Sequence, residues 1–363
     1  MNNPGIKSGG KMKSGFLFLT VVSVMVLSTL TFSQDTTQHK DKGIFDSSLH
    51  HTGSGMKYWY DKKQGGIELI TGVPYSDLSC KNCHIESCDV CHKVEKDGKG
   101  YYSVAAAKKK DLCLNCHQSI ASIRKINDEN NTPDVHSEAG LECLDCHSIR
   151  DVHGDGSKFT SLNDPGAISA KCENCHDSIS KNVSHYIHRN KVNCEGCHVR
   201  EVVSCTNTQL ETMMKDGKRV TQQLSGWEFL INYNGLVTSA TMQTYVGPGN
   251  KTFIKFTPKF SHSIRADGKK CQECHNNANV NEMKSGSMKL TWLENGKLEQ
   301  AHGVIPVTDS VIYKTVFQKY ENGKWVPIKN AEKPIIQFAG YGSPLTPKQI
   351  KRLQGKWKTK KLE

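Results

Sequence analysis

Apolar residues are spread unevenly along the chain, and the first concentration of them lies near the N-terminus. The apolar run 16–30 follows three lysines and is followed by the small residues Thr31 and Ser33. A basic stretch, a short apolar run and small residues at a cleavage point are typical of an export signal. The run is shorter than the about 20 apolar residues that a membrane-spanning helix needs. We therefore predict a signal peptide over 1–33, with a retained membrane anchor as the alternative.

The next clear pattern is an alternation of apolar and polar residues in the C-terminal half. It surrounds Asn234-Gly235 within residues 220–260, and it recurs around Asn295-Gly296 and Asn322-Gly323. Asn-Gly between alternating segments is a strong signal for a β-hairpin. Helical periodicity is rare, although Thr346 and Pro347 predict the start of a short helix that runs to about Leu353. The pattern predicts low regular secondary structure with short helices, followed by a β-hairpin-rich C-terminal part.

Composition changes this picture, because the chain holds few apolar residues and many cysteines. Hydrophobic residues make up 36% of the 363 residues, and there are 15 cysteines and 16 histidines. Fourteen cysteines fall into seven copies of Cys-x-x-Cys-His, and only Cys205 lies outside them. The seven copies are Cys80/Cys83/His84, Cys88/Cys91/His92, Cys113/Cys116/His117, Cys143/Cys146/His147, Cys172/Cys175/His176, Cys194/Cys197/His198 and Cys271/Cys274/His275.

This motif is the attachment sequence of haem c. The two thiols bond to the vinyl groups of one haem, and the histidine that follows binds its iron. Structural zinc sites do not require a histidine after every cysteine pair, a disulfide framework needs no histidines, and iron-sulfur clusters use a different cysteine spacing. The sequence therefore predicts seven covalently bound haem c groups in a haem-packed interior, with His84, His92, His117, His147, His176, His198 and His275 as proximal ligands.

On these motifs the chain resembles the periplasmic multihaem c-type cytochromes. This group includes electron carriers and also enzymes such as pentahaem nitrite reductase, hydroxylamine oxidoreductase and octahaem tetrathionate reductase, the last being nearest in appearance. The resemblance implies electron transfer along the seven haems, with a quinol dehydrogenase or other cytochromes as partners. The alternative is a reductase or oxidoreductase of a small nitrogen or sulfur compound. The lysine that replaces the motif histidine at the active haem of the nitrite reductases is absent from all seven motifs.

Nine histidines lie outside the motifs and are candidates for the second axial ligand of each iron. Three of them precede a motif at similar offsets, namely His136, His188 and His262. Resemblance to multihaem cytochromes implies that such an upstream histidine binds a neighbouring haem. His39 and His302 rank last because they lie far from any motif. The candidate distal ligands are His50, His51, His136, His153, His185, His188 and His262.

The motifs also divide the chain into regions. After the signal peptide we expect an N-terminal arm (34–79), a six-haem region (80–205), a hairpin insertion with the seventh haem (206–288), and a β-rich C-terminal region with a basic tail (289–363). The first two haems must be close neighbours, because five steps of extended chain from Cys83 to Cys88 span at most about 18 Å. That proximity permits direct electron tunnelling between porphyrins.

Charge and the remaining cysteine bear on partners and location. The formal charge falls from +12 to +9 when the three lysines of residues 1–33 are removed, and fourteen haem propionates would offset most of it. We therefore expect no nucleic-acid partner, and membrane association only if the signal segment is retained. Signal and haem chemistry together predict the periplasm, or another exported location, of a Gram-negative-type bacterium. Cys205 is a candidate catalytic thiol in the reductase alternative, against burial as an inert residue.

Overall fold

The computed structural model describes residues 42–78 and 85–355. These residues belong to one compact unit, Lys40–Glu363. The predicted signal peptide 1–33, His39, the first motif (Cys80, Cys83 and His84) and the tail 356–363 lie outside the described residues. Within the described part, no helix is both long enough and apolar enough to cross a membrane.

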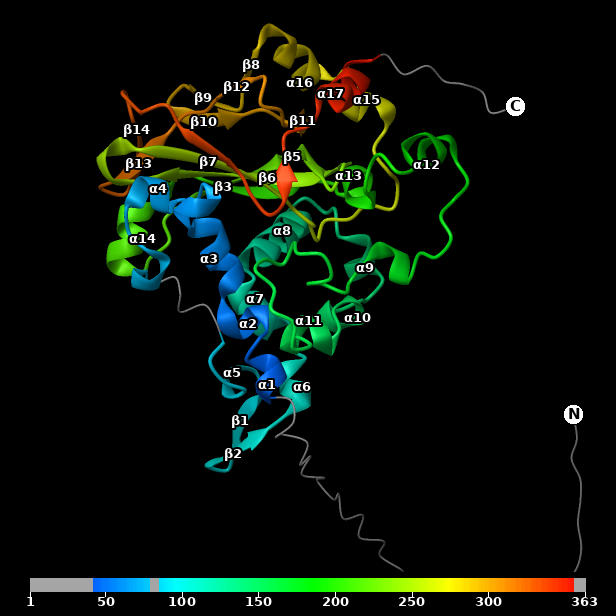
Figure 1. Ribbon diagram of the computed structural model, residues 1–363, viewed down its shortest axis with the longest axis vertical. Coiled ribbons are helices and arrows are strands. Elements are labelled where there is room, and N and C mark those ends of the chain that lie inside the picture. Colours follow the sequence, from blue (N-terminus) through cyan, green and yellow to red (C-terminus); the bar gives the residue numbers. More distant parts are fainter. Residues whose placement is uncertain (1–41, 79–84, 356–363) are drawn as a thin grey trace, which may run out of the picture. The chain divides into compact units, whose positions relative to one another are not determined.

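A mixed sheet of eight strands forms the centre of the unit, and its main path has the order β11-β5-β6-β7-β15 (Figure 1). The three middle strands are antiparallel, whereas β11 and β15 pair in parallel with β5 and β7. The strands of this path are β5 (Gln222–Tyr233), β6 (Leu236–Val246), β7 (Thr252–Pro258), β11 (Gly303–Pro306) and β15 (Ile335–Phe338). Off this path, β3 (Val202–Thr206) and β16 (Gly342–Ser343) pair with β5, and β4 (Thr208–Gln209) pairs with β6.

The three predicted Asn-Gly hairpins are confirmed. Asn234 and Gly235 join β5 to β6 with φ of 51° and 83°, the left-handed conformation that this type of two-residue turn requires. The second turn joins β9 (Thr291–Glu294) to β10 (Lys297–Gln300), and the third joins β13 (Gln318–Glu321) to β14 (Lys324–Pro327). The predicted β-rich character of the C-terminal part follows from these hairpins.

The main apolar core lies on one face of the sheet. Alternate residues of β5, namely Trp227, Phe229 and Ile231, are at most 1% exposed and belong to a single cluster. Met288 and Leu290, from the C-terminal part, complete this cluster and are fully buried. The sheet thus buries its apolar face beneath the C-terminal elements, which cover it in Figure 1.

The C-terminal elements end in the predicted helix. α17 (Pro347–Gln354) begins with a capping box, in which the Thr346 hydroxyl accepts the Gln349 N–H and the Gln349 side chain accepts the Thr346 N–H. It packs against α16 (Ala278–Glu282) and bonds the residues that follow α15 (Cys271–Cys274), while β8 (Ser287–Lys289) pairs with β12 (Ile312–Lys314). The predicted helix start is therefore confirmed, with Pro347 as the first helical residue.

The segment 85–198 has a different construction. It consists of short helices and one hairpin, and its longest helix is the 12-residue α8 (Gln118–Glu129). Only two apolar side chains of this segment, Ile123 and Ala167, are buried in the described structure, whereas Val90, Ile149, Ile179 and Tyr186 are at least half exposed. Its other elements are α5 (Asp89–His92), β1 (Lys93–Lys96), β2 (Lys99–Tyr102), α6 (Val104–Ala107), α7 (Lys110–Cys116), α9 (Val135–Glu138), α10 (Cys143–Cys146), α11 (Ile149–His153), η5 (Cys172–Asn174), α12 (Val183–His188) and α13 (Cys194–His198).

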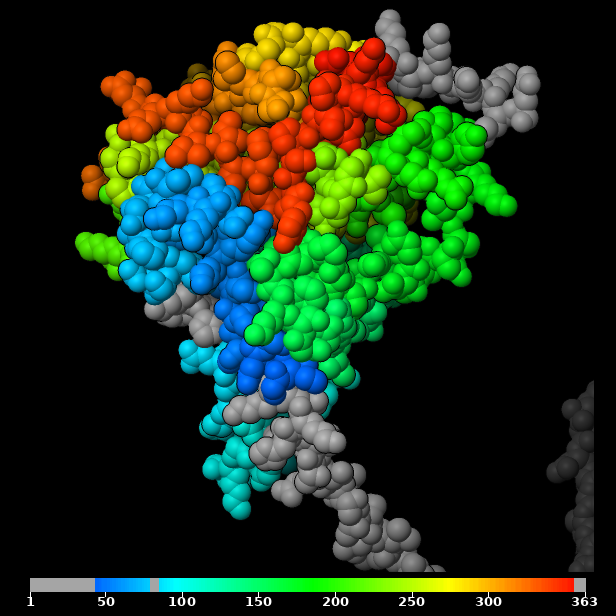
Figure 2. Space-filling view, viewed as in Figure 1, coloured from blue at the N-terminus to red at the C-terminus, as the bar shows by residue number. Residues whose placement is uncertain are grey.

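The N-terminal arm lies along the sheet and reaches the motif-bearing segment. Tyr60, Ile67 and Ile70 form a second buried cluster with Tyr245 of β6 and Phe253 of β7. The Ser54 hydroxyl donates to the Phe159 carbonyl at 2.7 Å, and Figure 2 shows arm and segment in contact on one face. The arm contains α1 (Lys42–Phe45), α2 (Leu49–Thr52), α3 (Ser54–Tyr60) and α4 (Glu68–Thr71).

Candidate haem centres

Each of the six described motifs forms a single helical turn. In five of them the histidine N–H donates to the carbonyl of the first cysteine, at 2.7–3.0 Å. The sixth lies within α13, where Cys194 begins the helix and His198 ends it. Side chains three and four positions apart in a helix lie on the same face. The turn therefore presents both thiols and the imidazole to one side, as attachment of one haem requires.

The motif thiols are accessible for such attachment. All twelve described motif cysteines are free and either exposed or half-buried, whereas Cys205 is buried in β3. A reacting group can therefore reach these sulfurs without rearrangement of the chain around them. The segment 85–198, with its two buried apolar side chains, also leaves apolar surface that a large hydrophobic ring could cover.

Cys175, the second cysteine of the fifth motif, lies in an exposed stretch of the polypeptide. Cys172 begins the 3₁₀ helix η5, and Cys175 lies just beyond its end, with its N–H donating to the Cys172 carbonyl at 3.3 Å. The Cys175 side chain is exposed, as are all residues of 171–182. The physical reason is local composition, because Ile179 is the only aliphatic residue in this polar stretch and the polypeptide builds no core there. The polypeptide by itself therefore does not cover the Cys175 thiol.

The six described motif histidines each face a second histidine. In every pair, one ring belongs to a motif and the other to a predicted distal ligand, and the ring centroids are 6.0–6.3 Å apart. The pairs are His50–His117, His92–His153, His136–His176, His147–His262, His185–His198 and His188–His275.

This spacing fits a metal ion held between two imidazoles. An imidazole nitrogen lies about 2.0–2.1 Å from a bound metal and about 1.1 Å from its own ring centroid, so two rings on opposite sides of one ion have centroids about 6.3 Å apart. Direct stacking of aromatic rings brings centroids as close as about 4.5 Å. The pairs are therefore spaced as axial ligands on either side of one iron atom.

In four of the paired rings, a hydrogen bond to a backbone carbonyl decides which nitrogen is left to bind a metal. His198 and His275 bring their Nδ1 atoms to the carbonyls of Arg265 and Arg352, at 3.1 and 2.9 Å. The distal candidates His185 and His188 do the same with carbonyls of their own helix region, at 2.7 and 2.9 Å. Since a carbonyl only accepts, Nδ1 carries the proton in each case. Nε2 is then unprotonated and free to bind metal.

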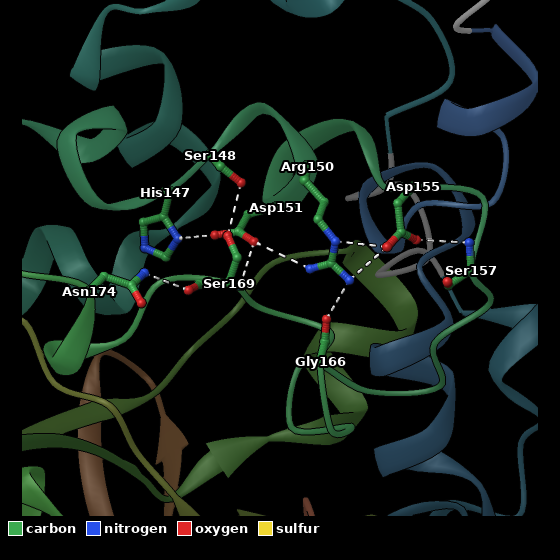
Figure 3. Close-up of polar contacts among 9 residues, drawn as sticks. All are labelled: His147, Ser148, Arg150, Asp151, Asp155, Ser157, Gly166, Ser169 and Asn174. Carbon is green, nitrogen blue, oxygen red and sulfur yellow. Dashed lines mark hydrogen bonds and ion pairs between the residues drawn. The ribbon is translucent and has the colours of Figure 1, made fainter.

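His147 is oriented by a carboxylate instead of a carbonyl (Figure 3). Its Nδ1 lies 3.3 Å from Asp151 Oδ2, and the other oxygen of Asp151 accepts the Ser169 N–H at 2.6 Å. Burial opposes ionisation of Asp151, yet the hydrogen bonds from Ser169 and His147 outweigh it and keep its pKa below the ordinary value. An anionic partner on Nδ1 makes the imidazole a more basic ligand.

Burial favours the neutral form of several paired histidines. It lowers the pKa of His50, His117 and His188, and it lowers the pKa of His262 to about 4. Because only a neutral imidazole can bind a metal through Nε2, these rings are in their ligating form at neutral pH. The residues therefore fit a haem iron.

His51 is the one distal candidate without a described motif histidine opposite it. Its Nδ1 donates to the carbonyl of Ile85 at 3.0 Å, and the N–H of Ile85 donates to the carbonyl of His50 at 2.8 Å. Ile85 directly follows His84, the histidine of the first motif. The structure thus anchors Ile85 beside α2. The Nε2 atom of His51 makes no hydrogen bond in the described residues and lies 3.9 Å from Asp46 Oδ1.

Successive motifs lie next to one another in chain order. Lys110 pairs with Glu142 at 3.3 Å between the third and fourth motifs, and the Ser148 and Ser169 hydroxyls are 2.9 Å apart between the fourth and fifth. The thiol of Cys172 lies 3.9 Å from Glu195 of the sixth motif. The Lys269 N–H, two residues before the seventh motif, donates to the carbonyl of Cys197 at 3.0 Å.

Thiols also approach one another between neighbouring motifs. Burial raises the pKa of Cys91 in the second motif, and the charge of Cys116 in the third motif adds to this effect. In the same way, burial raises the pKa of Cys146 in the fourth motif, and the charge of Cys175 in the fifth adds to it. Cys175 is therefore exposed but still close to the fourth motif. Haems attached at the fourth and fifth motifs would lie side by side.

Which histidines pair with each other cannot be read from their spacing along the chain. His136, His188 and His262 each face a histidine of a motif other than the one that follows them. His185 differs, because its partner His198 belongs to the next motif along the chain. Asp151 is the functional residue that sequence reasoning missed. Its position four residues after His147 in the short helix α11 was the available signal.

His302 and Cys205, the two remaining candidate site residues, lie apart from the histidine pairs. The His302 ring is beside Gly226, where an added Cβ would be 3.0 Å from its Nδ1. Cys205 is 6% exposed in the strand β3 and opposite Gln223 of β5. Within the described residues, no group of three or more histidine, cysteine, aspartate or glutamate side chains converges as a further metal site.

Comparisons with known proteins give little beyond this geometry. No family model matches the chain, and no curated protein matches it. Among solved structures, the chain has a weak similarity to an octahaem cytochrome c from Shewanella oneidensis, with 16% sequence identity and a TM-score of 0.28. The similarity covers 56% of this chain and 60% of that one. A TM-score at this level adds no weight to the motifs and the imidazole pairs.

Proposed function

We propose that this chain is an exported multihaem c-type cytochrome that transfers electrons along seven covalently bound haems. The observation that carries the proposal is the set of six imidazole pairs, each joining one Cys-x-x-Cys-His motif to a second histidine at the spacing of two axial ligands. When bound, each haem supplies a one-electron couple between ferric and ferrous iron.

The chain's own residues hold each haem at four points. The two motif cysteines would hold the haem through thioether bonds, and the motif histidine and the paired histidine would be the ligands of its iron. Hydrogen bonds on Nδ1 orient five of these rings, namely His147, His185, His188, His198 and His275. A site of this kind exchanges an electron with little reorganisation and leaves no position for a substrate.

We propose that His51 completes the set by binding the haem of the first motif opposite His84. The Nδ1 hydrogen bond of His51 to Ile85 supports this assignment, because it frees Nε2 beside the residue that follows His84. With it, all seven predicted distal ligands have a role. His39 and His302 then have none.

The order of the motifs in space supports a single path for electrons. Contacts join the third motif to the fourth, the fourth to the fifth, the fifth to the sixth and the sixth to the seventh. We propose that electrons enter and leave at the ends of this series. The donor and acceptor would be redox proteins such as a quinol dehydrogenase or another cytochrome, met outside the cytoplasm after removal of residues 1–33.

A reductase would need an iron with one protein ligand and one open position. Each of the six described motif histidines instead faces a second imidazole, so we propose the electron carrier over the reductase. Electron paramagnetic resonance of the oxidised protein separates the two. We expect low-spin signals only, unchanged by nitrite, hydroxylamine or tetrathionate. A high-spin signal of one haem per chain that responds to one of these compounds would support the reductase and contradict the carrier.

A further inference from the structure

Lys259 lies between two of the imidazole pairs. It follows β7, its N–H donates to the carbonyl of Ser239 at 2.9 Å, and its ammonium donates to the hydroxyl of Ser119 at 3.1 Å. Ser119 is two residues after His117 and Lys259 is three residues before His262. The ammonium therefore lies close to both the His50–His117 pair and the His147–His262 pair.

The surroundings of this ammonium contain no carboxylate from the chain. In the described residues no acidic side chain comes within ion-pair distance of Lys259, and its side-chain hydrogen bond goes to the neutral Ser119 hydroxyl. Lys259 is half-buried, and this burial lowers its pKa. Its charge also reaches both pairs, since it adds to burial and to the neighbouring imidazole in lowering the pKa of His117 and His262.

The two buried lysines of the described chain each have a partner for their charge. Lys255 is 5% exposed, and its ammonium lies over the rings of Trp59 and Tyr245, at 4.9 and 5.6 Å from their centroids. Lys269 is 3% exposed and forms an ion pair with Glu228, which is 1% exposed. A buried charge is tolerated in proteins when it is paired. Lys259 lacks such a partner within the described chain. A carboxylate from outside the polypeptide would therefore meet no competing carboxylate of the described chain at this ammonium.

We propose that the Lys259 ammonium binds a propionate carboxylate of one of the two haems held by the His50–His117 and His147–His262 pairs, and that it thereby raises that haem's reduction potential. This inference rests on the proposed function, because it requires haems at these pairs. The cation stabilises the ferrous state, which carries one positive charge fewer than the ferric state, and this is the origin of the expected shift.

The test compares charge-removing and charge-keeping variants of the haem-loaded protein. Lys259→Met and Lys259→Gln remove the charge, the second while keeping a hydrogen-bond donor for Ser119. Lys259→Arg keeps the charge, and Lys251→Met is the matched control on an exposed lysine at the other end of the same strand. The measurement is a spectroelectrochemical titration, with haem content determined by mass spectrometry for each variant.

We expect the potential of one haem to become more negative in the methionine and glutamine variants. The arginine variant and Lys251→Met should titrate as the wild type does. Loss of one haem from the uncharged variants, with all seven retained in the arginine variant, would equally support the proposal. Unchanged potentials in both uncharged variants, or the same haem loss in the arginine variant, would overturn it. A wild-type protein without haems would instead contradict the proposed function itself.

Discussion

The clearest prediction concerns the carboxylate that orients His147. Asp151 is 2% exposed in its side chain, lies 3.3 Å from the His147 Nδ1 and accepts the Ser169 N–H at 2.6 Å. Asp151→Asn keeps the shape of the side chain but removes its charge. It also offers an amide N–H₂ to neighbours that are themselves donors.

The magnitude follows from the contacts that are lost. A hydrogen bond to a charged group contributes about 1.5–3 kcal/mol, so we expect the free energy of unfolding to fall by about that amount. Mutation of a residue that hydrogen-bonds to a metal-binding histidine also lowers metal affinity or activity by about 10–100-fold. The His147 imidazole becomes a less basic ligand without its anion, so the potential of its haem should rise.

Two measurements check this, namely guanidinium denaturation and spectroelectrochemical titration. Asp155→Asn is the matched control, because Asp155 bonds the Arg150 guanidinium at 2.7 Å in the same loop but is more exposed and does not contact His147 (Figure 3). We expect a raised potential for Asp151→Asn only, and a larger loss of stability for Asp151→Asn than for the more exposed Asp155→Asn. The same potential shift in both variants, or none in Asp151→Asn, would refute the role given to Asp151.

Three further predictions follow from single residues. His262→Ala should convert one haem to a high-spin signal in electron paramagnetic resonance, whereas His302→Ala should leave the spectrum unchanged; low-spin signals alone in the first variant would remove His262 from the ligand set. Burial lowers the pKa of Lys255 to about 7 from 10.5, so the unfolded chain binds more protons between these values and folding becomes more favourable as pH rises through them. Lys255→Met should therefore be more stable than the wild type near pH 7, with a difference that shrinks toward pH 10.5 in denaturation curves; a constant difference would contradict this. Thr346→Ala should lower the free energy of unfolding by about 1 kcal/mol through loss of the helix cap, and an unchanged value would show that the capping box contributes nothing.

Local sequence rules predicted the local elements well. The Asn-Gly pairs gave the three hairpins because only a few residues adopt the left-handed conformation that such turns need. The same rule would have found the missed β1–β2 hairpin, where Asp97 and Gly98 have φ of 52° and 71°. Thr346 and Pro347 marked the C-terminal helix because capping is decided within one turn.

Long-range arrangement could not be predicted in the same way. Nothing in spacing pairs His147 with His262 or His188 with His275, because these contacts depend on how the sheet and the short helices pack. The average composition also did not show how unevenly the buried apolar residues are distributed along the chain. The buried apolar side chains are concentrated in the sheet and arm, whereas the segment 85–198 has only two.

The mass of the intact protein, purified from a host that exports and matures c-type cytochromes, tests the central proposal most directly. We predict the mass of the chain that begins after Ser33 plus seven covalently bound haem groups, retained under denaturing conditions. A colourless protein, or a mass equal to the polypeptide alone, would contradict the proposal that the seven Cys-x-x-Cys-His motifs carry haem.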